Sequence, residues 1–399
     1  MEKKQHIFYT LGGVVLGILL TTALWMCAGL SANTAFAAGS PTQDPLADIL
    51  VHRAASLIQE QNVSITTDTD VSRSQPVHCS YTSLSTDDSD THDAEISDFK
   101  VVGYYPSWKP AMVHTIDFEV VTHVCYAFAI PMADGSLRDL DNPNTARALI
   151  RSAHANNAKI LLSVGGWNYN GTLLEGVFME ATSTDEGVKR LADNIIAMCE
   201  NYGFDGVDMD WEHPRTDGTS SKQYEALMLE LSGRLHSKGK LLTAAVLSGA
   251  TADGSIYYDA AAHTDQVLNA VDFINVMAYD GGDGERHSSY PFAVDCGTYW
   301  KKTRGLPASK VVLGLPFYAR PGWADYGTIL ESVPDAWSRD HALYNGMEVC
   351  YNGVDTIAKK TSYAKENLGG VMIWELTKDA AEKDKSLLQA VKAAALHQD

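Results

Sequence analysis

Basic residues are scarce in this sequence. Its 399 residues contain 31 Lys and Arg against 50 Asp and Glu, a formal net charge of −19. Nucleic acids and anionic membranes repel an acidic surface, so the charge argues against both as partners. A neutral or cationic ligand fits better. The composition is otherwise that of a globular protein, because 45% of the residues are hydrophobic and 20% are charged.

Long apolar runs are missing except at the N-terminus. Lys3 and Lys4 precede an apolar run over residues 7–30, and Ala35-Phe36-Ala37 offers small residues for cleavage. We therefore predict that residues 1–37 are a secretory signal peptide, which implies a secreted protein. The run is long enough to span a bilayer, so an uncleaved membrane anchor stays open as the alternative.

Apolar surface is also scarce in residues 38–97, which are rich in Ser, Thr and Asp. Such a segment can bury too little apolar surface to offset the conformational entropy that the chain would lose on folding, so we predict a disordered acidic spacer. An amphipathic stretch at residues 46–58 is compatible with one short helix inside it.

Cysteine is too scarce for a disulfide framework. Outside the predicted signal peptide the five cysteines are an odd number and cannot all pair within one chain: Cys79, Cys125, Cys199, Cys296 and Cys350. Cys125 and Cys199 lie in apolar segments, where we expect buried thiols. The pair expected to form a bridge, if one forms, is Cys296 with Cys350.

Heptads, short-period repeats and Gly-Pro arrays are missing, whereas strand-like and helix-like patterns alternate from residue 98 onward. The strand-like runs are 100–105, 120–130, 159–164, 206–211, 241–247, 271–279, 311–318 and 369–376. The helical patterns are 144–155, 185–202, 223–237, 356–367 and 381–396. Apolar strands alternating with helices indicate a parallel sheet covered on both faces.

Eight such units predict an α/β fold, a (β/α)8 TIM barrel, over residues 98–399. The competing layout is a doubly wound open sheet. No G-x-G-x-x-G follows the first predicted strand, so the nucleotide signature of that fold is missing and we expect no nucleotide cofactor. We expect a monomer.

The stretch DGVDMDWE, residues 205–212, places four carboxylates in an otherwise apolar predicted strand. Side chains alternate between the faces of a strand, so the apolar residues are expected to face the helices and Asp208, Asp210 and Glu212 the barrel interior. Asp205 points the other way and is expected to brace the strand. A solvated acidic face and a calcium or magnesium site are the alternatives; we predict no metal.

Glu212 is the candidate proton donor. Same-face neighbours in a strand are roughly 6.6 Å apart, so three buried carboxylates cannot all stay ionised cheaply. At least one must hold a proton. Glu212 lies nearest the C-terminal mouth, where barrel active sites are built, and a raised pKa suits a general acid at neutral pH.

These residues resemble glycoside hydrolase family 18, the chitinase family, whose strand-four signature DGxDxDxE is complete here. SVGGW at 163–167 resembles the family's third-strand SxGG, MAYD at 277–280 its sixth-strand motif, and WEL at 374–376 its eighth-strand tryptophan. The resemblance covers residues 99–396.

The resemblance implies retaining hydrolysis assisted by the substrate, unlike the scheme with a carboxylate nucleophile. Glu212 would protonate the glycosidic oxygen, and the N-acetyl carbonyl of the sugar would attack its own anomeric carbon to give an oxazolinium ion. Asp210 would orient the acetamide and share a proton with its acidic neighbours. Asp208 would hold that pair electrostatically.

The resemblance also implies the residues around the sugar. Tyr279 would donate a hydrogen bond to the acetamide oxygen, and Trp374 would form the apolar floor, although either residue on its own would be assigned to the core. Ser163 is expected to support Asp208, and Gly165 with Gly166 to allow a tight turn above the strand. The predicted substrate-binding set is Trp374, Asp280, Met277, Tyr105, Trp167, Tyr318, Ser163 and Gly166.

Several aromatic residues just beyond predicted strand ends are candidate sugar-stacking platforms, with ordinary packing as the alternative: Trp108, Trp167, Tyr169, Tyr318 and Trp323. The segment between Tyr318 and Gly369 is short, whereas many chain-end-degrading relatives carry a sizeable insertion there. This favours an open groove and internal cleavage.

The first functional hypothesis is a secreted endo-acting chitinase that binds chitin or N-acetylglucosamine oligosaccharides. The second is an endo-β-N-acetylglucosaminidase acting on the chitobiose core of N-glycans, which could use the same chemistry. Trp211-Glu212 followed by His213-Pro214 favours the chitinase. A non-catalytic sugar-binding lectin is the third, and the presence of Glu212 argues against it.

Overall fold

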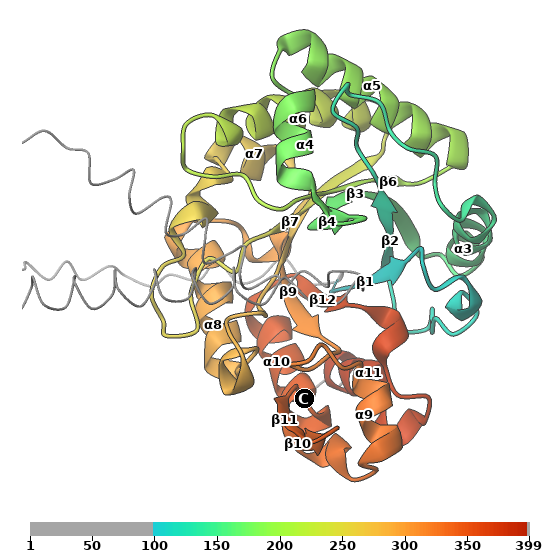
Figure 1. Ribbon diagram of the computed structural model, residues 1–399, viewed down its shortest axis with the longest axis vertical. Coiled ribbons are helices and arrows are strands. Elements are labelled where there is room, and N and C mark those ends of the chain that lie inside the picture. The colour runs from blue at the N-terminus through green and yellow to red at the C-terminus, as the bar shows by residue number, and fades with distance from the viewer. Residues whose placement is uncertain (1–98, 397–399) are drawn as a thin grey trace, which may run out of the picture. The chain divides into compact units, whose positions relative to one another are not determined.

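The computed structural model describes residues 99–396, which form a closed barrel of eight parallel strands (Figure 1). The strands are β1 (Lys100–Pro106), β2 (His123–Ala129), β3 (Lys159–Gly166), β6 (Gly206–Trp211), β7 (Leu241–Val246), β8 (Phe273–Val276), β9 (Val311–Pro316) and β12 (Gly370–Trp374). Each barrel strand pairs with the next along the chain, and β12 closes the ring on β1. The predicted (β/α)8 barrel is confirmed, and each predicted run overlaps one barrel strand.

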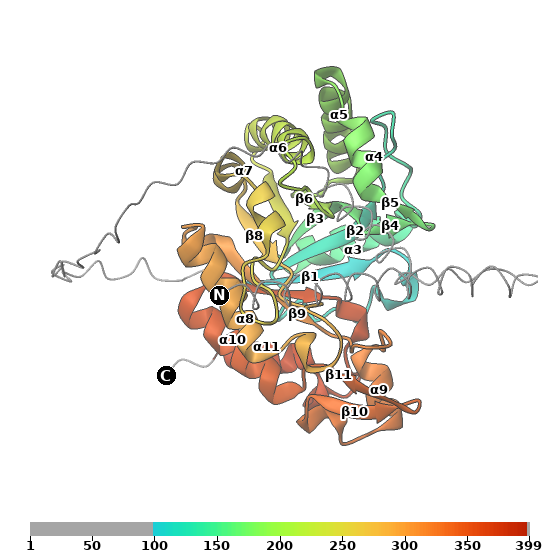
Figure 2. The same ribbon diagram turned by 60° about the vertical axis from the view of Figure 1, so that its left-hand side comes forward.

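Helices surround the barrel (Figures 1 and 2). They are α3 (Pro143–Ala155), α4 (Leu174–Ala181), α5 (Asp185–Tyr202), α6 (Ser220–His236), α7 (Asp265–Ala270), α8 (Tyr290–Thr298), α9 (Tyr326–Ser332), α10 (Val354–Asn367) and α11 (Leu387–Leu396). Local chemistry sets the ends of α5: Thr184 accepts a hydrogen bond from the backbone N–H of Gly187, and Gly203 ends the helix at φ 88°.

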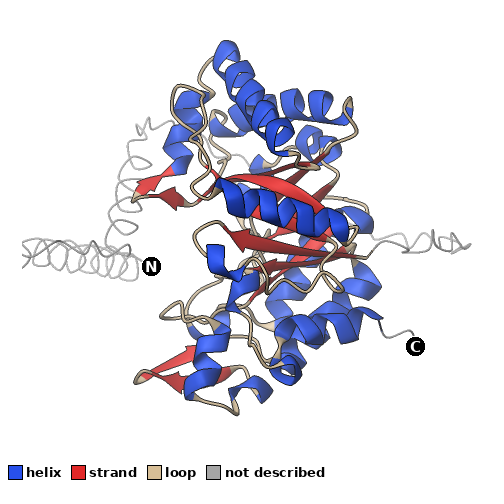
Figure 3. Cartoon of the chain, turned by 90° about the vertical axis from the view of Figure 1, so that its right-hand side faces the viewer, coloured by secondary structure: helices blue, strands red, loops and turns tan. Residues whose placement is uncertain are grey.

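Two small hairpins lie on the same side of the barrel (Figure 3). One pairs β4 (Asn168–Tyr169) with β5 (Thr172–Leu173), directly after β3. The other pairs β10 (His341–Tyr344) with β11 (Met347–Cys350) and lies in the chain between β9 and β12. The segment after the seventh barrel strand thus holds α9, this hairpin and α10.

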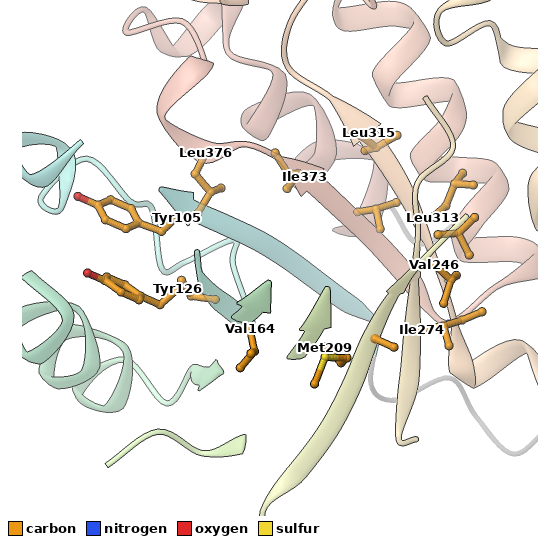
Figure 4. Packing of buried hydrophobic residues seen from close by; sticks show 14 of the residues in the cluster. Tyr105, Tyr126, Val164, Met209, Val246, Ile274, Leu313, Leu315, Ile373 and Leu376 are labelled. Carbon is orange, nitrogen blue, oxygen red and sulfur yellow. The ribbon is translucent and has the colours of Figure 1, made fainter. Parts of the chain in front are cut away.

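The core has two parts because side chains alternate along each strand. The outer part packs between strands and helices and includes Val164, Met209, Val246, Ile274 and Leu313 (Figure 4). The inner part fills the barrel with aliphatic, sulfur-containing and aromatic side chains: Val102, Tyr104, Cys125, Ala127, Leu161, Phe273, Val312 and Met372. The barrel is therefore a packed core rather than a pore.

The cysteine predictions have mixed outcomes. Cys125 and Cys199 are buried, as expected. The expected Cys296–Cys350 bridge is wrong, because both cysteines are free. Cys296 is buried on α8, whereas the half-buried Cys350 ends β11, whose backbone pairs with Arg320. The predicted signal peptide, the spacer and the helix at 46–58 lie outside the described residues, as do Cys27 and Cys79. None of the helices in residues 99–396 combines the length and the hydropathy that a membrane span requires.

Candidate active site

The side chains of β6 divide as alternation predicts. Met209 and Trp211 belong to the outer core, whereas Asp208 and Asp210 are buried among the inner side chains. Glu212 follows the last residue of β6, and its side chain is 18% exposed. These three carboxyl groups, Asp208, Asp210 and Glu212, form an acidic column. The column is turned inward and ends, at Glu212, at a position that a ligand can reach.

Asp205 braces the opposite end of the same strand. Its Oδ2 accepts hydrogen bonds from the backbone N–H of Ile160 at 2.8 Å and lies 3.0 Å from Nε2 of His154. This confirms the expected bracing role and ties β6 to β3 and α3 at the N-terminal side of the barrel.

Asp208 lies in a cage of hydrogen-bond donors. Its Oδ2 accepts bonds from the hydroxyls of Tyr104 at 2.7 Å and Ser163 at 2.8 Å. Its Oδ1 accepts from Thr243 Oγ1 at 2.6 Å and Asn275 Nδ2 at 3.1 Å. Burial raises the pKa of Asp208, and the four hydrogen bonds offset part of that rise. The predicted support from Ser163 is confirmed.

Sequence reasoning missed Tyr104, Thr243 and Asn275. Thr243 and Asn275 are polar residues inside apolar strand runs, which was a usable signal. Tyr104 shares the inward face of β1 with Val102. The prediction chose Tyr105 instead, and it was wrong. The Tyr105 ring packs against Tyr126 in the outer core (Figure 4). The Tyr105 hydroxyl donates a hydrogen bond to the carbonyl of Lys109.

Asp210 is buried without full hydrogen bonding. Its Oδ1 finds no hydrogen-bond partner among the described residues. Burial, together with the charges of Glu212 and Asp208, raises the pKa of Asp210 well above its ordinary value. This carboxyl group is therefore favoured in its protonated form and keeps an oxygen available for a ligand.

Glu212 has the electrostatics of a proton donor. Burial and then the charge of Asp280 raise the pKa of Glu212 to about 7. Its Oε2 lies 3.4 Å from Nε2 of His213, whose own pKa is lowered to about 3, chiefly by burial. The imidazole is therefore neutral at physiological pH and does not neutralise the carboxylate.

Asp280 is held in the ionised state. Its Oδ2 accepts a bond from the Tyr318 hydroxyl at 2.7 Å, and its Oδ1 accepts from Arg320 Nη1 at 3.1 Å and lies 3.3 Å from His287 Nδ1. Burial opposes ionisation, but His287, Tyr318 and Arg320 together hold the pKa of Asp280 below its ordinary value. His287 and Arg320 had not been predicted.

Tyr279, Met277 and Trp374 all pack against the inner core. The Tyr279 hydroxyl has a weak contact with Met372 Sδ at 3.8 Å, and burial raises the pKa of this tyrosine well above its ordinary value. Its phenol is therefore a neutral hydrogen-bond donor. Trp374 meets Tyr104 edge-on, with ring centroids 5.4 Å apart, so it lies next to the cage around Asp208.

The candidate platforms separate into two groups. Trp108 and Trp167 are 54% and 43% exposed. Trp108 lies beside Phe128, which stacks on Trp374, and Trp167 lies beside His213. The exposed Trp108 ring, which follows β1, is thus linked to the site through Phe128 and Trp374. The exposed Trp167 ring, which follows β3, is linked to Glu212 through His213.

The other three candidates have their rings in contact with protein groups, although Trp323 is itself 56% exposed. Tyr318 is 1% exposed, so its predicted role in substrate contact is replaced by support of Asp280. Trp323 stacks on Tyr318 and carries the Arg320 guanidinium 4.0 Å from its ring centre. Tyr169 lies under Arg138 and bonds to Asp141.

Gly165 and Gly166 shape the end of β3. Both have positive φ, 119° and 89°. A Cβ on Gly165 would lie 2.2 Å from the carbonyl oxygen of Asp210, and a Cβ on Gly166 would lie 2.7 Å from the Phe128 ring. Gly165 therefore lets β3 approach the acidic strand, and Gly166 makes room for the Phe128 ring of β2. The positive φ of both residues is the backbone freedom for which glycine was expected at this strand end.

Residues 99–396 contain no group of three or more His, Cys, Asp and Glu arranged to hold a metal ion. The acidic column holds three carboxyl groups in different environments. Asp208 accepts four hydrogen bonds, Asp210 has an oxygen without a partner among the described residues, and Glu212 is accessible and has a raised pKa. This arrangement suits proton transfer to a neutral ligand.

Comparisons with known proteins agree with this geometry. The sequence profile "Glycosyl hydrolases family 18" matches residues 100–379. Chitinase A1 of Niallia circulans is 27% identical over 75% of this chain and 59% of its own length, and Chitotriosidase-1 of Mus musculus is 27% identical over 70% and 73%. The solved GH18 chitinase ChiB from the chitin utilization locus of Flavobacterium johnsoniae matches with TM-score 0.64 and 30% identity, over 75% of this chain and 94% of that chain. The chain thus spans less than two thirds of Chitinase A1.

Proposed function

The chain belongs to glycoside hydrolase family 18, and from that premise we propose that it is an endo-acting chitinase that hydrolyses β-1,4-linked N-acetylglucosamine polymers. The observation that carries the proposal is Glu212, an accessible carboxyl group with a pKa raised to about 7 at the end of an inward acidic column. Such a group holds a proton at neutral pH and can give it to a leaving sugar.

In the proposed first step, Glu212 protonates the glycosidic oxygen while the acetamide carbonyl of the sugar attacks the anomeric carbon. The bond to the leaving sugar breaks and an oxazolinium ion forms, so no carboxylate acts as nucleophile. In the second step, water adds to the anomeric carbon while the bond between that carbon and the acetamide oxygen breaks, which restores the N-acetyl group, and the water gives its proton to Glu212, which restores the acid. Configuration is retained because the anomeric carbon is displaced twice.

Asp210 and Tyr279 are proposed to hold the acetamide during this reaction. The unpartnered Oδ1 of Asp210 can accept its N–H, and the neutral Tyr279 phenol can donate to its carbonyl oxygen. Four hydrogen-bond donors hold Asp208 in place. Asp208 would stabilise the positive charge that develops on the sugar electrostatically, acting together with Asp210 and Glu212. Trp374 would form the apolar surface beneath the sugar ring.

Internal cleavage is supported by the aromatic residues. Trp108 and Trp167 expose large ring faces that can each stack on a sugar, so several units of a polymer could be bound at once. The segment between β9 and β12 adds only α9, a short 3₁₀ helix at Ala336–Ser338, the β10–β11 hairpin and α10. Export remains part of the proposal on the strength of residues 1–37; mass spectrometry of the mature N-terminus would test it.

The experiment is a product profile. The full-length protein is incubated with defined N-acetylglucosamine oligomers and, in parallel, with a high-mannose glycoprotein. The proposal predicts cleavage within the oligomers and mixed short products. Release of intact glycan without oligomer cleavage would instead support the endo-β-N-acetylglucosaminidase, and binding of oligomers without cleavage would support the lectin.

A further inference from the structure

Buried polar atoms without protein partners gather at the C-terminal end of β6, both on its outer side and beside Glu212. In the part of the chain that the structure describes, they include Trp211 Nε1, His213 Nδ1, the Tyr224 hydroxyl and both ring nitrogens of His263. Trp211, Tyr224 and His263 are at most 1% exposed. Such groups are costly to bury unless something hydrogen-bonds to them.

These residues are neighbours. The Trp211 and Tyr224 ring centroids are 5.8 Å apart, and those of Tyr224 and His263 are 5.1 Å apart, both with edge-to-face geometry. A positive charge on His213 would lower the pKa of His263. The rings of Trp211, Tyr224 and His263 therefore form one contiguous set that joins β6 to α6 and to the segment before α7, and His213 follows two residues after Trp211 at the end of β6.

Their hydrogen-bonding capacities are complementary. Trp211 can only donate, Tyr224 can donate and accept, and a neutral His263 can do each once. His213 supplies an acceptor at Nδ1 when its proton is on Nε2, and that Nε2 lies 3.4 Å from Oε2 of Glu212. A water molecule with two to four such partners is the usual way in which proteins satisfy a buried polar set.

We propose that Trp211, His213, Tyr224 and His263 enclose ordered water that bonds to Nδ1 of His213 and thereby directs its Nε2–H at Glu212. This inference rests on the proposed function, and it makes His213 a positioning residue for the proton donor. Tyr224 and His263 act through His213.

The consequence follows from the two protonation states of Glu212. After Glu212 has given its proton away, the Nε2–H of His213 donates a charge-assisted hydrogen bond to the carboxylate and stabilises it. Loss of this bond would favour the protonated acid, so the pKa of Glu212 would rise. The other charged groups around this pair are Asp210 and Asp280 beside Glu212, Arg215 and Asp259 beside His213, and Arg304 beside His263.

The test compares His213→Phe, Tyr224→Phe and the double variant, with kcat and KM measured from pH 5 to 9 on an N-acetylglucosamine oligomer. Tyr326→Phe is the matched control, because this buried tyrosine bonds to the carbonyl of Lys385 between α9 and the segment before α11. We expect His213→Phe to lower kcat about tenfold, the scale of one charge-assisted hydrogen bond, and to move the alkaline limb to higher pH.

Tyr224→Phe should lower kcat about threefold with KM unchanged, because a water-mediated contact is weakened, and the double variant should resemble His213→Phe. Tyr326→Phe should leave the pH profile unchanged. The inference is overturned if Tyr224→Phe keeps the kcat and pH profile of the parent, as expected when an unused hydroxyl is removed from a packed ring.

A readout independent of turnover separates this inference from the proposed function. Imidazole ¹⁵N spectra, assigned with the single variants, should show the proton of His213 on Nε2 and a shift of both His213 and His263 in Tyr224→Phe. A proton on Nδ1, or no shift in Tyr224→Phe, contradicts the inference. An inactive parent protein would contradict the proposed function, and these spectra would still decide the inference.

Discussion

Asp280 and Glu212 show how one side chain sets the protonation of another. Asp280 is kept ionised by Arg320, Tyr318 and His287, and its charge helps to raise the pKa of Glu212 to about 7. A carboxyl group with this pKa is protonated at neutral pH only because a neighbouring negative charge and burial oppose its ionisation.

The first prediction concerns pH. The proposed mechanism requires protonated Glu212, and this form is lost as pH rises through about 7, so kcat/KM should fall above that pH. Asp280→Asn removes the charge that raises the pKa of Glu212, and should move the alkaline limb to lower pH by up to about one unit. The measurement is kcat/KM from pH 5 to 9.

The control for this prediction is Asp283→Asn, which removes another carboxylate that pairs with Arg320 but is 56% exposed. It should leave the limb in place. An Asp280→Asn limb unchanged from the parent protein would show that Asp280 does not set the pKa of Glu212.

Residue-level predictability depended on whether a residue carried an unusual chemical signal. The acidic set of β6 and the bond from Ser163 to Asp208 followed from alternation and motif position. Tyr104 was missed because β1 contains two adjacent tyrosines and the chosen one faces outward. His287 and Arg320 lie in loops, where no periodicity indicates which way a side chain points.

At the scale of elements, the contact of β3 with β6 is the close approach on which the site depends. The two strands pair from Leu161 with Gly206 to Gly166 with Trp211, which places Gly165 beside Asp210. A side chain at Gly165 has no space on the side of β6.

The second prediction is that Gly165→Ala destabilises the fold by about 3 kcal/mol or more, because it combines strain at positive φ with a backbone clash. Gly171→Ala is the matched control, since Gly171 also has positive φ, 81°, but its Cβ would meet open space. That variant should lose only about 1 kcal/mol. Urea unfolding measures both, and equal losses would contradict the close approach.

The barrel strands and the long helices were predicted correctly because their hydropathy patterns are clear, whereas the short helices and the hairpins have no such pattern. All eight strands were found because each is a short apolar run, and the longer helices have clear amphipathic spacing. The short helices α4, α7, α8 and α9 were missed, since six to nine residues hold too few turns to show a period. The hairpins were missed as well; tertiary packing decides such elements.

For the whole molecule, the acidic charge and the exposed aromatic rings point to the same kind of ligand. A net charge of −19 does not attract anionic polymers, whereas a neutral sugar polymer can stack on Trp108 and Trp167. The two rings reach the acidic column through different neighbours, Phe128 and His213.

The third prediction is that Trp108→Ala and Trp167→Ala each raise KM about tenfold for long N-acetylglucosamine oligomers, which corresponds to losing one stacked sugar. Short oligomers that do not reach the removed ring should show a smaller change. Trp337→Ala, at a 37% exposed tryptophan outside this set, is the control. Equal effects on long and short oligomers would argue against an extended binding surface.

The central claim is that Glu212 donates the proton that breaks the glycosidic bond. The most direct measurement is the turnover of an N-acetylglucosamine oligomer by Glu212→Gln, together with the affinity of that variant for the same oligomer. The account predicts that kcat falls by at least about a hundredfold, because a glutamine cannot donate this proton, while oligomer binding is retained. Near-normal turnover by Glu212→Gln would contradict the account.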